Sequence, residues 1–408
     1  MRALVFIAFL NLVAPADRHA FALAAPPAAP AATPKAPEKG PEKALEKAPD
    51  NLVSPQVHAD RRVTFRLWAP KAQAVELAGE WTRAGAPPNA PQKMERDPAG
   101  LWSLTVGPLE PNIYIYVFQV DGMTIVDPIN PFVKLRVRTS ASMVEVPGGE
   151  PWEFRDVPHG TLTTHTHASR VLGGVERQVV IYTPPGYDPR RGARYPVTYL
   201  LHGNNDLAVG WTMAGRANFV LDAFLAEKKA RPMIVVMPWG HALPFGTRPP
   251  PGQPDNNDLF ERYLLEEVVP LVEKNHRIAP GRGNRAIVGL SMGGTQALQI
   301  GLGHPDRFGT VGIFGAGLER EAFDARYAEI LAKRPKRFAK DLFFVGVAVE
   351  DRVLARAKSL AEALASHALN VTYHETSGGH TYAVWRKLLV ETVPLLFPRT
   401  SRSPAPRE

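Results

Sequence analysis

A serine lies inside a tight glycine pattern, Gly289-Leu290-Ser291-Met292-Gly293, directly after an apolar run and directly before a segment with helical character. A serine at such a sharp strand-to-helix turn presents its hydroxyl above the sheet, and only small residues fit two positions before and after it. The turn also leaves free N–H groups at the helix start, where negative charge is favourable. This pattern predicts that Ser291 is a nucleophile and that the Met292 backbone N–H stabilises an oxyanion.

A serine hydroxyl needs a base to accept its proton and a third group to orient that base. Where the serine occupies this kind of turn, the chain order is serine, acid, histidine. His380 follows the last predicted strand, Asn370–Thr376, in a loop that contains Gly378-Gly379, and it precedes a predicted helix. Because the glycines let the loop bend back over the sheet, His380 is the predicted base among the 12 histidines.

The orienting acid is expected at the end of the strand that precedes the histidine strand. Two carboxylates, Glu350-Asp351, end the predicted strand Phe343–Val349. Asp351 is favoured because its shorter side chain makes a stiffer orienter, and Glu350 is the alternative. Asp351 also suits the N-cap of the helix that starts near Val353, so a purely capping role competes with the catalytic one.

A second oxyanion donor is expected in the loop after an early buried strand. The predicted strand Val197–Leu201 ends in His202-Gly203-Asn204. This order predicts that the Asn204 backbone N–H is the second donor and that His202 positions the loop.

Four further residues are predicted to contact substrate because they lie in loops beyond strand ends or near the helices that follow. Ligands bind at such places in open α/β sheets. Arg216 could meet a carboxylate or a phosphate, and a solvated arginine at a helix start is the alternative. The four predicted residues are Trp211, Arg216, Trp239 and His241.

The elements that must position these residues occupy residues 148–398. Continuous apolar runs alternate with helical patterns, which predicts a doubly wound, mostly parallel α/β sheet buried on both faces. The predicted strands are Val179–Tyr182, Val197–Leu201, Met233–Met237, Ala286–Leu290, Val311–Phe314, Leu342–Val345 and Asn370–Thr376. The predicted helices are Ala217–Lys229, Leu259–Asn275, Thr295–Gly303, Arg320–Lys333, Val353–His367 and Tyr382–Leu396.

Residues 55–147 have a different pattern, in which short segments alternate polar and apolar residues between turn signals. This pattern predicts an all-β, immunoglobulin-like sandwich. Its large aromatic residues are Trp68, Trp81 and Trp102, and residues of this size are usually buried in a core.

The N-terminus predicts export. Met1-Arg2 precedes the apolar run Ala3–Ala14, and Ala22-Leu23-Ala24 supplies a small-residue cleavage site, so residues 1–24 are a predicted signal peptide. The run is too short for a membrane span, which needs about 20 residues. Residues 25–54, rich in Pro, Ala, Lys and Glu, are a predicted disordered linker, and residues 399–408 a disordered tail. We expect a periplasmic or secreted protein without stable membrane insertion.

Composition excludes several kinds of chemistry. The chain has 408 residues, a formal net charge of +8 and scattered Lys and Arg, so nucleic-acid binding is not expected. Without cysteine it has no disulfide, thiolate zinc site or cysteine nucleophile. Neither a metal nor another cofactor is expected, because no carboxylate cluster accompanies the histidine pair His165 and His167.

Segments of the second unit resemble the esterase D and feruloyl-esterase group of α/β-hydrolases. That group includes carbohydrate acetyl and feruloyl esterases, enterochelin-type esterases and mycolyltransferases. The segments are Tyr195–Gly203, Gly210–Thr212, Pro232–Pro238, Asn284–Gly294 and His374–Thr381. The resemblance implies an α/β-hydrolase fold for residues 148–398.

The first unit is similar to the early-set sandwich at the front of glycogen-branching enzymes, isoamylases and some esterases. The similarity lies in Val63–Pro70, Gly79–Trp81 and Tyr114–Pro128. In those families the sandwich can bind polysaccharide through exposed aromatic residues, so the resemblance implies glycan binding by residues 55–147, with Trp68, Trp81 and Trp102 as the candidate contacts if they are exposed rather than buried in the core.

Together these patterns predict an exported serine esterase that hydrolyses carboxylic esters through an acyl-enzyme. The resemblance implies feruloyl or acetyl esters on carbohydrate, either small molecules or polysaccharides, as substrates. Two alternatives remain open. One is an enterochelin-type trilactone siderophore esterase, and the other is a non-catalytic carbohydrate-binding or envelope scaffold.

Overall fold

The computed structural model describes residues 47–81, 89–190, 192–333, 338 and 340–398. The predicted signal peptide, the predicted linker up to residue 46 and the predicted tail lie outside these residues. Within the described ranges, none of the helices is long and apolar enough to cross a bilayer.

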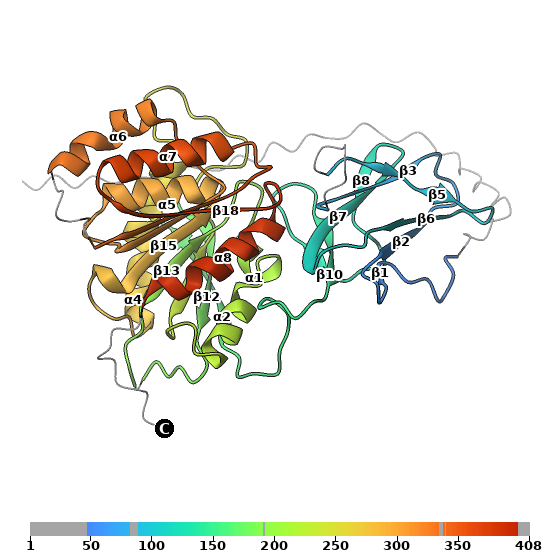
Figure 1. Cartoon of the computed structure of the whole chain (residues 1–408), viewed down its shortest axis with the longest axis horizontal. Helices are drawn as coiled ribbons and strands as arrows, with labels where there is room; N and C mark the ends of the chain where they lie inside the picture. The colour runs from blue at the N-terminus through green and yellow to red at the C-terminus, as the bar shows by residue number, and fades with distance from the viewer. Residues whose placement is uncertain (1–46, 82–88, 191, 334–337, 339, 399–408) are drawn as a thin grey trace, which may run out of the picture. The chain divides into compact units, whose positions relative to one another are not determined.

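The first part of the described chain is a sandwich of two antiparallel sheets (Figure 1). Its strands are β1 (Gln56–Val57), β2 (Val63–Trp68), β3 (Val75–Gly79), β4 (Gln92–Lys93), β5 (Glu95–Arg96), β6 (Leu101–Val106), β7 (Asn112–Val120), β8 (Met123–Ile125), β9 (Val133–Lys134) and β10 (Ala141–Val146). One sheet has the order β1-β2-β6-β5, and the other has the order β4-β3-β7-β10-β9 with β8 beside β7. The alternating pattern of the sequence therefore produces the predicted sandwich.

Two of the three large aromatic residues fill the sandwich core. Trp81 and Trp102 are buried in one apolar cluster with Phe65. Trp81 stacks on the Phe65 ring with 5.3 Å between ring centroids, and the Trp102 indole N–H donates to the Ala69 carbonyl at 3.0 Å. These two tryptophans are therefore not available to stack on a sugar.

The second part is built on one eight-stranded sheet. Its strands are β11 (Thr161–Ser169), β12 (Val175–Thr183), β13 (Val197–Leu201), β14 (Ile234–Pro238), β15 (Arg285–Leu290), β16 (Thr310–Phe314), β17 (Leu342–Ala348) and β18 (Asn370–Thr376). The order is β11-β12-β14-β13-β15-β16-β17-β18, with β11 and β12 antiparallel at one edge and parallel pairing from β14 to β18. The predicted α/β-hydrolase sheet is confirmed. The edge strand β11 is the one strand of this sheet that the sequence did not predict, because its residues are mostly polar and exposed.

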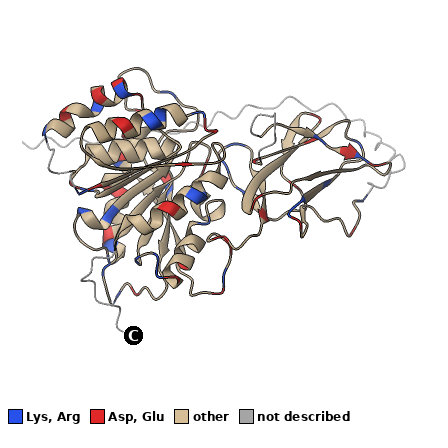
Figure 2. Cartoon of the chain, in the orientation of Figure 1, with Lys and Arg blue, Asp and Glu red and all other residues tan. Residues whose placement is uncertain are grey.

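Helices cover both faces of this sheet (Figure 1). They are α1 (Gly210–Met213), α2 (Ala217–Ala226), α3 (Asn256–Tyr263), α4 (Val269–Asn275), α5 (Met292–Gly303), α6 (Arg320–Lys333), α7 (Leu354–Ser366) and α8 (Tyr382–Leu396). One apolar cluster joins α3 to α7 with one face, and a second joins α1, α2 and α8 with the other. Charged residues lie mainly on the surrounding helices and loops, whereas the central strands are mostly uncharged (Figure 2).

The predicted helix Leu259–Asn275 is interrupted. Residues Leu264–Val268 form a π-helical turn between α3 and α4. Helix α5 begins at Met292, directly after the serine, rather than at the predicted Thr295. The earlier start matters for the site because it places the unpaired N–H groups of the first helical turn beside Ser291.

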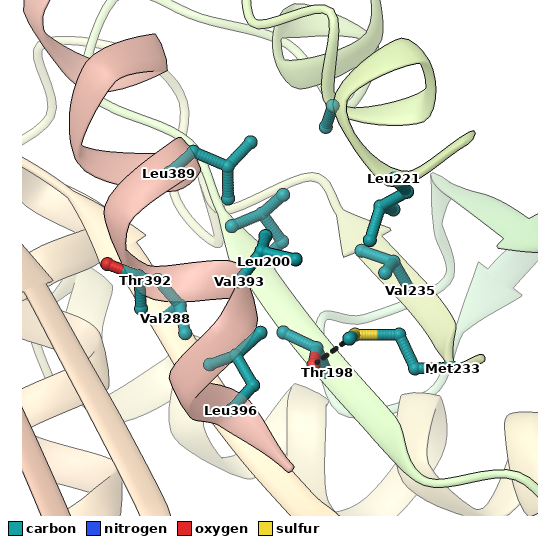
Figure 3. Close-up of a pocket in the computed structure, with 11 residues that line it drawn as sticks. Thr198, Leu200, Leu221, Met233, Val235, Val288, Leu389, Thr392, Val393 and Leu396 are labelled. Carbon is teal, nitrogen blue, oxygen red and sulfur yellow. Dashed lines mark hydrogen bonds between the residues drawn. The ribbon is translucent and has the colours of Figure 1, made fainter. Parts of the chain in front are cut away.

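A small apolar gap lies where α2 and α8 pack against the sheet (Figure 3). Its volume is about 10 Å³, and Leu200, Leu221 and Val393 are among the residues that line it. The one polar contact drawn there joins the Thr198 hydroxyl to the Met233 sulfur at 3.5 Å. Because a bound water already needs about 10–15 Å³, this gap is a packing defect and not a ligand site.

The sandwich and the α/β domain share buried contacts. Ile113 of β7 belongs to the same apolar cluster as Leu388 of α8. Arg386 of α8 is fully buried, and its guanidinium donates to the Asn112 side-chain oxygen at 2.7 Å and to the carbonyls of Ile113 and Ala214. A buried guanidinium is stable only when its donors are satisfied. The start of β7 is therefore fixed against α8.

Candidate active site

Ser291 occupies a strained turn between β15 and α5. Its backbone has φ +52° and ψ −115°, a conformation that costs a non-glycine residue about 1–3 kcal/mol. A Cβ at Gly289 would lie 2.1 Å from the Gly293 carbonyl oxygen, and one at Gly293 would lie 2.6 Å from the carbonyl oxygens of Leu201 and His202. A side chain at either position would overlap backbone atoms, so both positions require glycine, as the sequence pattern predicts.

The structure brings Ser291, His380 and Asp351 together. His380 Nε2 lies 2.9 Å from Ser291 Oγ, and His380 Nδ1 lies 2.7 Å from Asp351 Oδ2. Because a carboxylate only accepts hydrogen bonds, Nδ1 carries the proton and Nε2 is free to accept the serine proton. The Asp351 side chain is 1% exposed and that of His380 is 20% exposed, so the base is reachable while its orienter is shielded from water.

Asp351 is not the N-cap of α7, because Val353 occupies that position and α7 has no side-chain capping hydrogen bond. Asp351 Oδ2 holds His380, while Oδ1 accepts a hydrogen bond from the Val353 backbone N–H at 3.0 Å, next to the start of α7. Glu350, the alternative acid, is exposed, and its backbone N–H donates to the Gly378 carbonyl at 3.2 Å. The geometry therefore favours Asp351 as the orienter.

Gly315 leaves room for this arrangement and was not singled out in the sequence. It follows β16 with φ +53°, and a Cβ there would lie 3.3 Å from Asp351 Oδ2 and 3.4 Å from His380 Cε1. The same Cβ would lie 3.0 Å from the Trp385 indole nitrogen. A larger residue at this position would displace the histidine or its carboxylate.

His202 fixes the loop that holds the predicted oxyanion donor Asn204. Its Nε2 accepts from the Gly240 backbone N–H at 2.8 Å, so its Nδ1 carries the proton and donates to the Gly203 carbonyl at 2.8 Å. Gly240 is held in turn, because its carbonyl accepts from the Gln296 amide of α5 at 3.0 Å. Burial lowers the pKa of His202 from 6.5 to about 4, so the imidazole is neutral at neutral pH.

The sandwich also supports this loop, which the sequence did not indicate. Lys134 of β9 forms an ion pair with Asp206, and both side chains are almost completely buried. The Val137 N–H donates to the Asn205 carbonyl, and the Arg138 N–H donates to the Asn205 side-chain oxygen, both at 3.3 Å. Burial lowers the pKa of Lys134, and the Asp206 carboxylate opposes this effect and favours the charged ammonium.

A cavity of about 420 Å³ opens onto Ser291 and His380. Both parts of the chain contribute to its wall, so the sandwich helps to shape the space in which a substrate would lie. The other lining residues are Ala78, Glu80, Asn89, Ile115, Tyr116, Val117, Lys134, Arg136, Gly203, Asn204, Asn205, Arg352, Thr381, Tyr382 and Trp385.

None of the four predicted substrate contacts is among these lining residues, and Trp211 requires a correction. Trp211 is fully buried, and its indole N–H donates to the Leu201 carbonyl at 2.9 Å. It is a core residue beside the start of residues 202–206, the predicted oxyanion loop, and not a substrate contact. Arg216 lines a different cavity and lies 3.4 Å from the Glu145 carboxylate of β10.

Trp239 and His241 lie after β14 and are not among the residues of the cavity wall. The Arg177 guanidinium lies over the Trp239 ring at 4.4 Å from its centroid. The His241 ring is buried beside that of His202, with 5.7 Å between centroids. The expectation that ligands bind beyond the strand ends located the correct edge of the sheet. It did not identify which side chains line the cavity.

Two family models match the chain. The family described as "Putative esterase" matches residues 169–331, which include Asn204 and Ser291. The family described as "Carbohydrate-binding module 48 (Isoamylase N-terminal domain)" matches residues 53–132. The predicted resemblances of both parts of the chain are confirmed.

Relatives and solved structures agree with these matches. An endo-1,4-beta-xylanase/feruloyl esterase of Xylanibacter ruminicola is 30% identical over 84% of this chain and 46% of its own length. An uncharacterised protein of Corynebacterium glutamicum is 27% identical over 53% of this chain and 56% of its own length. The chain thus spans about half the length of the curated relatives it matches.

Among solved structures, a ferulic acid esterase of Anaeromyces mucronatus has 25% identity and a TM-score of 0.52, over 62% of this chain and 96% of that chain. The enterobactin esterase of Shigella flexneri has 19% identity and a TM-score of 0.61, over 82% of this chain and 93% of that chain. The second likeness shows a shared fold that extends beyond the α/β domain.

The first prediction concerns the ion pair between the sandwich and the oxyanion loop. Lys134→Met leaves the buried Asp206 carboxylate without its counter-ion, which costs about 3–5 kcal/mol of stability and releases the loop. We expect kcat on a short activated ester to fall at least about tenfold, with a smaller change in KM. Steady-state kinetics and the melting temperature test this expectation.

Two further variants serve as controls for Lys134→Met. Lys134→Met with Asp206→Asn removes the unpaired charge and is expected to regain stability, but not the full kcat. Lys93→Met, at an exposed lysine of β4, should change neither quantity. An unaltered kcat in Lys134→Met would show that the loop keeps its geometry without the ion pair.

The second prediction concerns pH. His202 binds its proton near pH 6.5 in the unfolded chain but only near pH 4 in the folded protein. Below pH 6.5 the unfolded state binds more protons, so stability falls as the pH drops from about 6.5 to about 4, by on the order of 3 kcal/mol. Melting temperatures of the native protein and of His202→Gln across this range test the effect.

His202→Gln lacks this titration, so its melting temperature should fall less steeply with decreasing pH. Burial also lowers the pKa of His167 and His276, and these two residues contribute equally to both proteins. Parallel curves for the two proteins would contradict the assignment to His202.

Proposed function

Because this chain combines an esterase-family α/β-hydrolase domain with an N-terminal carbohydrate-binding module 48 domain, we propose that it is a serine esterase. The observation that carries the proposal is the pair of hydrogen bonds at 2.9 and 2.7 Å that link Ser291 to His380 and His380 to Asp351. These contacts supply a nucleophile, a base with its free nitrogen toward the nucleophile, and a shielded orienter.

In the proposed reaction, Ser291 Oγ attacks the ester carbonyl while His380 Nε2 takes the hydroxyl proton. Asp351 holds the Nδ1–H and stabilises the imidazolium that forms. The backbone N–H groups of Met292 and Asn204 donate to the negative oxygen. His380 then protonates the departing alcohol, which leaves Ser291 acylated. Water attacks the acyl group by the same proton transfers and releases the acid.

Feruloyl or acetyl esters on carbohydrate are the proposed substrates. The similarity to a protein named for xylanase and feruloyl esterase activity, over 84% of this chain, supports this choice. The match of residues 53–132 to a carbohydrate-binding module supports a glycan ligand for the sandwich. Since Trp81 and Trp102 are buried, other residues would have to contact that glycan. Export remains a proposal from residues 1–24.

A trilactone siderophore esterase is the second candidate. The likeness to enterobactin esterase covers 82% of this chain, more than the α/β domain alone. Turnover of methyl ferulate, acetylated xylan and a ferric catecholate trilactone by the same preparation separates the two candidates. The substrate with the highest kcat/KM decides between them.

The third prediction tests the nucleophile. Ser291→Ala should lower kcat on a short activated ester by at least about 10³-fold, because it removes the attacking atom. It should also abolish covalent labelling by a fluorophosphonate probe. Ser366→Ala, at an exposed serine at the end of α7, is the matched control and should behave like the native protein. Native protein that neither reacts with the probe nor turns over any ester would instead support the non-catalytic scaffold.

A further inference from the structure

The wall of the active-site cavity is cationic. Among its lining residues are three basic side chains, those of Lys134, Arg136 and Arg352, and one carboxylate, that of Glu80. Lys134 is already paired with Asp206. The charge that remains for a ligand therefore comes from the two arginines.

Arg136 reaches this cavity from a segment in which basic residues alternate. Lys134 faces Asp206, and the Arg138 guanidinium lies over the Phe245 ring at 4.7 Å from its centroid. Arg136, between them, is half-buried and lines the cavity. Unlike Lys134, Arg136 has no carboxylate within ion-pairing distance of its guanidinium in the described part of the chain, and unlike Arg138 it lines the cavity.

Arg352 lines the same cavity from the α/β domain, in the loop after β17. It directly follows Asp351, the orienter of His380, and its side chain is exposed. Among the described residues it also has no carboxylate within ion-pairing distance. The two arginines thus border the same space as Ser291, one contributed by the sandwich and one by the loop after β17.

The carboxylates near the site are already in use. Asp206 pairs with Lys134, and Asp351 holds His380. Glu80 accepts a hydrogen bond from the Ile115 backbone N–H at 3.3 Å, and burial raises its pKa, which favours its neutral form. Glu80 also interacts electrostatically with Lys134, Arg386 and Arg136, so one carboxylate faces three cations.

We propose that Arg136 and Arg352 form an anion subsite that binds a carboxylate on the ester substrate. The guanidinium fork matches a carboxylate in two parallel hydrogen bonds. The substrates would be esters that carry a free carboxylate on the acyl or the alcohol part, such as esters of acidic sugars. The inference rests on the proposed serine esterase activity and specifies its substrate class.

The test compares matched ester pairs that differ in one carboxylate. On the acyl side, 4-nitrophenyl butyrate is compared with 4-nitrophenyl hydrogen succinate. On the alcohol side, 2-hydroxyethyl ferulate is compared with carboxymethyl ferulate. We expect the native protein to favour the carboxylate member of at least one pair by about fivefold or more in kcat/KM. Added salt should reduce this preference, because both arginines are accessible to solvent.

Single Arg136→Gln and Arg352→Gln variants assign the preference to these residues. Each should lower kcat/KM for the favoured carboxylate ester by about five- to tenfold, mainly through KM, and change the neutral ester less than about twofold. Arg326→Gln, at an exposed arginine of α6 outside the cavity lining, removes the same charge and should change neither.

The outcomes separate this inference from the proposed function. Equal rates for both members of each pair, or a preference that survives in both arginine variants, overturn the anion subsite while leaving the esterase intact. Arginine variants that impair only a ferric catecholate ester overturn the assignment to a carboxylate. If no neutral or charged ester is turned over, the proposed function itself fails.

Discussion

The candidate site depends on the close backbone contacts around Ser291, where the start of α5 packs against the ends of β15 and β13. Strand β15 must turn into α5 within one residue, and that residue takes a positive φ of +52°. The turn is possible because Gly289 and Gly293 have no Cβ, so α5 starts directly above β15 and beside the end of β13. The close contact between α5 and the end of β13 determines where the first N–H groups of α5 point. It also determines how near these groups lie to the loop that begins at His202. The predicted oxyanion donors Met292 and Asn204, the His380 imidazole and the cavity all lie around this turn.

Much of the fold and the reacting groups could be predicted because both depend on local patterns. Buried parallel strands are continuous apolar runs, and the elbow needs glycines at fixed offsets from the serine. Asp351 and His380 could be predicted from their positions after β17 and β18, because these parallel strands end at the same edge of the sheet as β15. The π-helical turn at Leu264–Val268 escaped prediction because its residues continue a helical apolar pattern without a break.

The cavity wall could not be predicted in the same way. Lys134 meets Asp206 across 72 positions of sequence, and no local pattern links a β-sandwich edge to a loop of another domain. Trp211 was wrongly predicted to contact substrate because a large aromatic residue in a loop is compatible with either a ligand site or a core. Its buried indole and its hydrogen bond to the Leu201 carbonyl decide for the core. Residues that perform chemistry have recognisable neighbours, whereas residues that surround a substrate are defined by tertiary contacts.

The sandwich, which matches a carbohydrate-binding module, also supports the predicted oxyanion loop and forms part of the cavity wall. A binding module joined by a linker would contribute substrate affinity and leave catalysis to its neighbour. Here the apolar cluster of α8 continues into β7, Arg386 is buried between them, and Lys134 lies against the oxyanion loop. A buried ion pair adds little net stability, but removing one partner is costly, so such a pair fixes a geometry rather than strengthening a fold. The loop that carries the predicted oxyanion donor Asn204 and the cavity beside Ser291 are consequently formed by the two domains together, and the α/β domain alone would lack one wall of this cavity.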